Sequence, residues 1–173
     1  YIEKQYSNVE CYLTGENLGY AKANNIGLKK CTTKFSLVLN PDTILEENTL
    51  KNLIHLANKY KDFYLIGPFN QQDKKIVNNS KYIEAQDAIE VENLKGYAIF
   101  FNMNKFKDIG FFDENYFLYF EEIDLCKKIK KINGKIYAGI NINIFHDGAK
   151  SVQDNNFELE KNRNWHWMWS TFY

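Results

Sequence analysis

Residues 108–129 read DIGFFDENYFLYFEEIDLCKKI. This stretch combines a glycine turn, a dense aromatic run and three closely spaced carboxylates, Glu121, Glu122 and Asp124. Carboxylates beside so much apolar surface lose hydration on folding, which raises their affinity for protons toward neutral pH. The stretch therefore predicts a site whose carboxylates have a functional role. Acidic residues at the start of a helix are also favoured by the helix dipole, which is the structural alternative.

Two further polar points follow apolar runs. Asn40, Pro41 and Asp42 follow the run at 35–39, and His146 follows the run at 142–145. Polar groups at the ends of strands are typical of an active site in an α/β protein, so the sequence predicts an α/β sheet with its site along one edge. The expected helices cover 19–30, 45–60 and 118–132, and the expected strands cover 9–13, 35–39, 63–66, 97–101, 135–138 and 142–145.

Composition excludes some classes of partner. The chain has 173 residues, enough for one domain with a real core. Lys plus Arg and Asp plus Glu both number 22, and Arg163 is the only arginine. A balanced charge with scarce arginine argues against a nucleic-acid partner. The three cysteines are widely spaced without a CxxC pair, which indicates reduced thiols and predicts a cytoplasmic location.

Four blocks of this chain resemble family 2 glycosyltransferases, in particular the branch similar to rhamnosyltransferases and galactofuranosyltransferases. They are 17–27, 37–42, 110–126, and His146 with Gly148 and Ser151. The resemblance implies a GT-A (nucleotide-diphospho-sugar transferase) fold, in which helices flank a mostly parallel mixed sheet. It also implies transfer of a sugar from a nucleotide donor with a divalent cation, Mg²⁺ or Mn²⁺.

The same resemblance predicts a partial domain. Family members begin with a strand and an Asp that hold the nucleotide, and these elements are not found in this chain. We therefore expect residues 1–173 to be the C-terminal two thirds of one catalytic domain, lacking its first strand or strands, with an aromatic helix at about 155–173. We also expect these residues alone to be inactive.

The resemblance assigns two metal ligands, Asp42 and His146. A carboxylate is the oxygen donor that hard cations prefer, and an imidazole would complete the shell. Asn40 stands where the family commonly has a first aspartate, and its amide would orient the donor without adding charge. Considered singly, Asn40 to Asp42 is more often a turn, and so is a single His beside Asp147 and Gly148.

The resemblance places the catalytic base among the acids of the opening stretch. Inverting transfer needs a carboxylate that accepts the proton of the acceptor hydroxyl. Glu122 occupies the position of the family base, one methylene longer than the expected Asp. Glu121 and Asp124 are the alternatives.

Four further residues are implied on the substrate side. Asn24 and Asn25 would face the nucleotide, with Asn24 where many relatives have Arg. Gly96 would let a sugar approach the backbone, and Asp113 would shape the acceptor side. Each has a plainer interpretation, as helix-surface amides or as a turn cap.

These inferences predict an inverting glycosyltransferase of bacterial surface-polysaccharide synthesis. The donor would be a dTDP- or UDP-sugar, and the acceptor a glycan or lipid-linked glycan. Trp165, Trp167 and Trp169 would either pack on another segment or give peripheral association with the inner face of the cytoplasmic membrane. The alternatives are a non-catalytic GT-A module that binds glycan or a partner, and a nucleotidyltransferase, which the scarcity of arginine disfavours.

Overall fold

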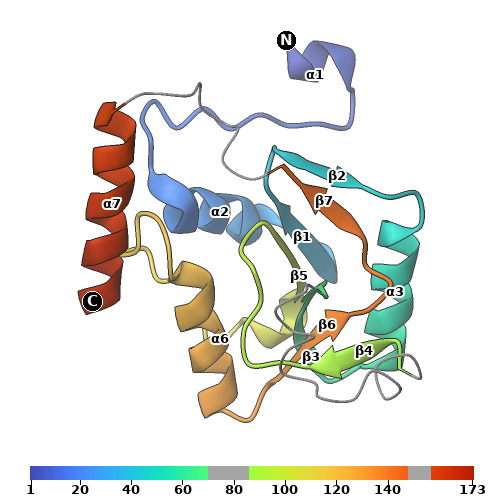
Figure 1. Cartoon of the computed structure of the whole chain (residues 1–173). Coiled ribbons are helices and arrows are strands. Elements are labelled where there is room, and N and C mark those ends of the chain that lie inside the picture. Colours follow the sequence, from blue (N-terminus) through green and yellow to red (C-terminus); the bar gives the residue numbers. More distant parts are fainter. Residues whose placement is uncertain (70–85, 148–156) are drawn as a thin grey trace.

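A five-stranded sheet forms the centre of the protein (Figure 1). The structure is a computed structural model that describes residues 1–69, 86–147 and 157–173. Across the sheet the order is β1 (Phe35–Leu39), β5 (Ala98–Asn102), β3 (Phe63–Pro68), β6 (Lys135–Gly139) and β4 (Ala88–Glu90). A second, two-stranded sheet pairs β2 (Thr43–Leu45) with β7 (Ile144–His146). The predicted α/β class and mixed sheet are confirmed.

Strand directions refine the expectation of a mostly parallel sheet. The pair β3–β6 is parallel, whereas β1–β5, β3–β5 and β4–β6 are antiparallel. Thus β1, β3 and β6 share one direction, but only one of the four neighbouring pairs among the described strands is parallel. Every residue of β5 is buried, as expected for a central strand, whereas β1 at the edge of the described sheet buries only Val38. The interpretation of 35–39 as a buried strand of a parallel ladder was wrong.

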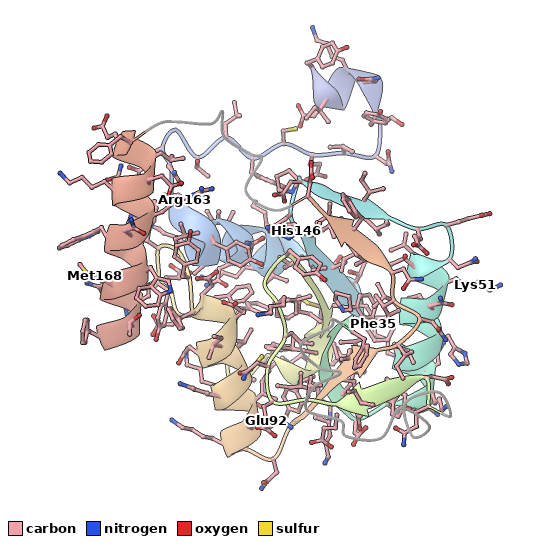
Figure 2. All side chains as sticks on the ribbon, in the orientation of Figure 1. Phe35, Lys51, Glu92, His146, Arg163 and Met168 are labelled. Atoms are coloured by element: carbon pink, nitrogen blue, oxygen red, sulfur yellow. The ribbon has the colours of Figure 1, made fainter. Side chains whose placement is uncertain are left out.

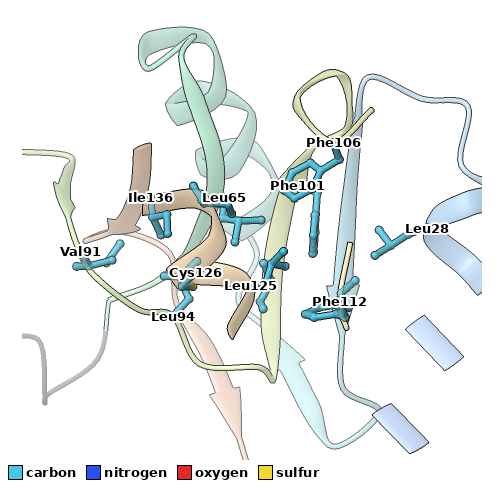
Figure 3. Packing of buried hydrophobic residues seen from close by; sticks show 14 of the residues in the cluster. Leu28, Leu65, Val91, Leu94, Phe101, Phe106, Phe112, Leu125, Cys126 and Ile136 are labelled. Atoms are coloured by element: carbon cyan, nitrogen blue, oxygen red, sulfur yellow. The ribbon is translucent and has the colours of Figure 1, made fainter. Parts of the chain in front are cut away.

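Helices cover both faces of this sheet (Figure 1). On one face, α2 (Gly19–Lys30) and α6 (Glu121–Lys131) pack Leu28, Leu125 and Ile129 against Leu65 and Phe101 (Figure 3). On the other face, α3 (Thr49–Lys59) packs its buried side chains against the alternate strand residues. These are Leu53, Leu56 and Ala57 against Phe63, Ile66 and Phe100. The period-2 alternation of Phe100 and Phe101 divides the core into these two layers.

Some local predictions were wrong for identifiable reasons. Residues 9–13 form no strand and are exposed. The helix expected from 45 begins at Thr49, because residues 43–45 pair with β7 instead. Leu50 and Ile54 of this helix are exposed. The short elements α1 (Ile2–Gln5) and η1 (Met103–Lys105) add little to the core, since neither buries a residue.

The sequence predicts the C-terminal end of α6 correctly but not its start. Its predicted end at Asn133 and Gly134 is confirmed, with Asn133 at φ 57° and the Gly134 amide donating to the Ile129 carbonyl at 2.9 Å. Its start lies at Glu121 rather than 118, because Tyr119 (φ 70°) and Phe120 (φ 69°) adopt the left-handed conformation. This turn places the acids in the first turn of the helix.

The aromatic C-terminal helix is confirmed as α7 (Phe157–Phe172). Trp167 of this helix contacts Phe120. The other large side chains share one exposed stripe at helical spacing: Trp165, Met168, Trp169 and Phe172. Figure 2 shows Met168 on the side of α7 away from the sheets. Among the described residues, no helix combines the length and apolarity that a bilayer crossing requires.

Candidate functional site

A cleft of about 520 Å³ lies where five segments of the chain meet. The segments are the start of α2, the end of β1, the residues before β5, the start of α6 and the end of β7. The cleft is lined by Tyr20, Asn40, Lys95, Gly96, Tyr97, Leu118, Tyr119, Glu121, Glu122 and His146. Four predicted residues that are distant in sequence, Asn40, Gly96, Glu122 and His146, therefore share one cavity.

Asp42 and His146 come together through the small sheet. Thr43 pairs with His146 in the β2–β7 ladder, so the residue before Thr43 lies beside the imidazole. The Asp42 Oδ1 atom lies 3.3 Å from His146 Nε2. The ring of Tyr97 stacks on the imidazole at 4.6 Å between centroids and 6° between planes. His146 is thus held between a carboxylate and an aromatic ring, in the middle of the molecule (Figure 2).

This pair fits a divalent cation. Asp42 Oδ1 is buried and accepts no hydrogen bond from the described residues, so a lone pair is left for a ligand. The Oδ1 to Nε2 distance is close to the roughly 3 Å edge of an octahedron around a cation bound at about 2.1 Å. No group of three or more His, Cys, Asp or Glu side chains suited to a metal occurs among the described residues.

Glu121 and Glu122 form the acidic wall of the cleft. Glu121 is only 4% exposed, and its Oε2 atom has no hydrogen-bond partner in the described part of the chain. Burial, together with the charge of Glu122, raises the pKa of Glu121 to about 7. Burial also raises the pKa of Glu122, while the nearby Lys95 acts in the opposite direction. The two acids therefore differ in proton affinity, the arrangement by which a site separates acid from base roles.

Asp124, the third acidic candidate, is not brought to this wall. It does not line the cleft, and its Oδ2 atom pairs with Lys128 Nζ at 2.8 Å one helical turn away. Asp124 is half-buried, and its contact is an ion pair between neighbouring turns of α6.

Gly96 lies close to Glu122, as expected of a glycine that would let a sugar approach the backbone. The Tyr20 hydroxyl donates to the Gly96 carbonyl. A Cβ atom on Gly96 would lie 3.8 Å from the Glu122 carboxyl carbon and 3.6 Å from the Tyr20 oxygen, which is ordinary contact. A methyl group would therefore fit, but it would occupy part of the space beside Glu122.

Three predicted substrate residues lie outside the cleft. Asn25 is 3% exposed, and its amide bonds the Phe112 backbone in both directions, at 2.9 and 3.1 Å, and the Glu114 carboxylate at 3.0 Å. The Asn24 side chain donates to the Tyr20 carbonyl at 2.9 Å. Asp113 accepts from Asn115 and from the Tyr173 hydroxyl. These side chains bond to other parts of the protein and do not line the cavity.

Comparisons with known proteins decide the family. The model of the family described as "Glycosyl transferase family 2" matches residues 1–126, well over half of the chain. This chain belongs to glycosyl transferase family 2. It is 26% identical over 143 residues to the low-salt glycan biosynthesis hexosyltransferase Agl10 of Haloferax volcanii. That match covers 69% of this chain and 46% of Agl10, so the chain spans less than half of that curated relative.

A solved structure confirms the fold of this family 2 chain. The crystal structure of GalNAc-T7 with UDP, GalNAc and Mn²⁺ superposes with a TM-score of 0.68 at 12% sequence identity. The match covers 90% of this chain and 36% of that chain. The GT-A fold is therefore confirmed. Gly148 and Ser151, which belong to the fourth resembling block, lie outside the described residues.

Sequence reasoning missed five cleft residues: Tyr20, Lys95, Tyr97, Leu118 and Tyr119. Lys95 and Tyr97 flank the predicted Gly96, and Tyr20 lies inside the first resembling block, so their positions were the available signal. Their residue types gave none, because the chain contains 12 tyrosines and 22 basic residues.

The raised pKa of Glu121 predicts a pH-dependent stability. The folded-state pKa of about 7 exceeds the ordinary 4.5, so the folded protein binds more protons than the unfolded chain between these values. The free energy of unfolding therefore falls as pH rises through this window. Glu121→Gln should remove this loss, stabilising the protein by up to about 3 kcal/mol at pH 8 and by far less at pH 5.

Urea denaturation of the parent and the variant at the two pH values measures this difference. Glu92→Gln is the matched control, since the Glu92 side chain is 81% exposed. An equal change in stability at pH 5 and pH 8 for Glu121→Gln would contradict the assignment.

Proposed function

We propose that the protein carrying this chain is an inverting, metal-dependent hexosyltransferase. It would move a sugar from a dTDP- or UDP-sugar to a hydroxyl of a glycan or lipid-linked glycan during bacterial surface-polysaccharide assembly. The main support for this proposal is that Glu122 and His146 line one cleft and that Asp42 contacts His146. The family membership and the name of the relative Agl10 support hexosyl transfer.

In this proposal Glu122 is the base. Its carboxylate accepts the proton of the acceptor hydroxyl while that oxygen bonds to the anomeric carbon from the side opposite the leaving group. The bond between the anomeric carbon and the diphosphate oxygen breaks, and its electron pair leaves with the nucleotide. One attack from the opposite side inverts the configuration at that carbon.

Glu121 keeps the base ionised. Two carboxylates placed close together in a poorly hydrated wall are not easily both charged, so the group with the higher proton affinity holds the proton. The pKa of about 7 for Glu121 makes it that group near neutral pH. Lys95 adds a positive charge that favours the ionised form of Glu122.

Asp42 and His146 would hold Mg²⁺ or Mn²⁺ on the donor diphosphate. A divalent cation bound there would neutralise the charge that develops on the leaving nucleotide. The buried Oδ1 of Asp42, which accepts no hydrogen bond from the described residues, supports this role. Asn40, which also lines the cleft, would orient the donor without charge.

The finer assignments are also part of the proposal. The rhamnosyltransferase and galactofuranosyltransferase-like branch rests on the resembling blocks at 37–42 and 110–126. Cytoplasmic location with peripheral association at the membrane is supported by the exposed Trp165, Met168 and Phe172 of α7. Co-sedimentation with anionic phospholipid vesicles tests this association, and full recovery in the supernatant would contradict it.

A transfer assay tests the function as a whole. The protein carrying this chain is incubated with UDP-hexoses or dTDP-rhamnose and oligosaccharide acceptors, with Mn²⁺ or with EDTA. Product should form only with the cation, and its anomeric configuration, read by NMR, should be opposite to that of the donor. Retained configuration, or equal turnover in EDTA, would contradict the proposal.

A further inference from the structure

The aromatic helix α7 packs on the segment that leads into the catalytic acids. It lies beyond the residues 1–126 that the family model matches. Figure 1 shows α7 beside α2 and the loop that enters α6. Met168 of the exposed stripe points away from this contact (Figure 2), whereas the ring of Trp169 lies edge-on to Tyr116 at 6.4 Å between centroids.

The segment 113–118 is also contacted by Ser170 and His166 of α7 and by Tyr173, which follows α7 directly. Ser170 is 5% exposed, and its hydroxyl donates to the Leu118 carbonyl at 2.9 Å. The imidazole of His166 stacks on the ring of Phe117 at 4.3 Å and 19°. The Tyr173 hydroxyl donates to the Asp113 carboxylate at 3.2 Å.

The start of α2 holds the same segment from another side. The Tyr20 amide donates to the Phe117 carbonyl at 2.8 Å. Gly19 has φ +75°, and a Cβ atom there would collide with the Phe117 backbone. Phe117 is therefore held by a backbone hydrogen bond to α2 and by a ring stack to α7.

The residues after Phe117 need such support. Tyr119 and Phe120 both have the left-handed conformation, which is unfavourable for residues with a side chain and persists where surrounding contacts impose it. Leu118 and Tyr119 line the cleft, and Glu121 and Glu122 follow directly. A relaxation of this turn would rotate the first turn of α6 and move both carboxylates.

We propose that α7 is a positioning element for the catalytic acids, with Ser170 and His166 as its positioning residues. The hydrogen bond and the ring stack hold the left-handed turn, and the turn directs Glu122 toward the acceptor hydroxyl. This inference rests on the proposed transferase function. It assigns to the C-terminal helix a role in kcat rather than in donor binding.

Ser170→Ala tests the hydrogen bond. It should lower kcat about tenfold, a fraction of the loss that a 1 Å misplacement of a reacting group causes. The Kd of the nucleotide in the presence of Mn²⁺ should stay unchanged, because the contact lies on the side of the acids. Thr171→Ala is the matched control, since the Thr171 hydroxyl donates at 2.8 Å to Trp167 within α7 and is exposed.

His166 gives a second, independent variant with a rescue. His166→Ala removes the ring stack and should lower kcat in the same way, whereas His166→Phe retains an aromatic face over Phe117 and should restore it. A merely structural role of α7 would change thermal stability without this separation of kcat from nucleotide Kd.

Hydrogen exchange of the peptide 117–124 separates this inference from the proposed function. Ser170→Ala should accelerate exchange there, and Thr171→Ala should not. Unchanged kcat in both Ser170→Ala and His166→Ala, with an active parent, overturns the inference and leaves the proposed function standing. A parent without any transfer overturns the proposed function, and unaccelerated exchange in Ser170→Ala overturns the positioning role.

Discussion

Glu122→Gln should lower kcat for sugar transfer by about a thousandfold, within the range that general base catalysis contributes. The amide has nearly the shape of the carboxylate but does not accept the proton of the acceptor hydroxyl. Glu122 lines the cleft, and its substitution changes neither Asp42 nor His146, the proposed metal-binding pair. The Kd of the nucleotide with Mn²⁺, measured by calorimetry, should therefore stay within about twofold of the parent value.

Asp124→Asn is the matched control for this variant. Asp124 lies on the same helix but pairs with Lys128 outside the cleft, so transfer should continue at close to the parent rate. Normal turnover by Glu122→Gln would remove the role of base from Glu122. Glu121, the other acid of the wall, would then be the residue to test by the same substitution.

Asp42→Ala should weaken cation-dependent nucleotide binding by about a hundredfold or more, since even the loss of an outer partner of a metal ligand costs 10 to 100-fold. The substitution removes the buried Oδ1 atom and leaves His146 as the one remaining protein ligand of the predicted pair. Calorimetric titration of UDP or dTDP with Mn²⁺ present measures the loss.

The metal-free titration is the internal control for Asp42→Ala. With EDTA the parent and the variant should bind nucleotide equally weakly, because only the cation-mediated contribution has been removed. Asp87→Ala adds a distant carboxylate control, since Asp87 pairs with Lys59 of α3 and does not line the cleft. Cation-dependent affinity equal to that of the parent would remove Asp42 from the metal site.

The sequence predicted those helix ends that depend on local residue types. The bounds of α2 follow from its composition and from Gly19, and the end of α6 follows from Asn133 and Gly134. The start of α6 was missed because Tyr119 and Phe120 are not residue types that favour the left-handed conformation. Strand pairing was also missed, since the position of β5 between β1 and β3 depends on contacts distant in sequence.

The site was predictable to the extent that its residues fall in recognisable blocks. Glu122 and His146 share the cleft as expected, although the β2–β7 ladder that brings Asp42 to His146 was not foreseen. Asn25 shows why residue type is a weak guide to role. The same amide that would suit a nucleotide is satisfied here by Phe112 and Glu114.

The buried amide of Asn25 also constrains how this protein can be re-engineered. Asn25 ties α2 to the loop at 112–114, and a backbone hydrogen bond ties Tyr20 to Phe117. A chimera that imports the loop of another transferase without its partner helix leaves the Asn25 amide unpaired, at a cost of about 1–3 kcal/mol. The two segments should therefore be exchanged together in any chimera.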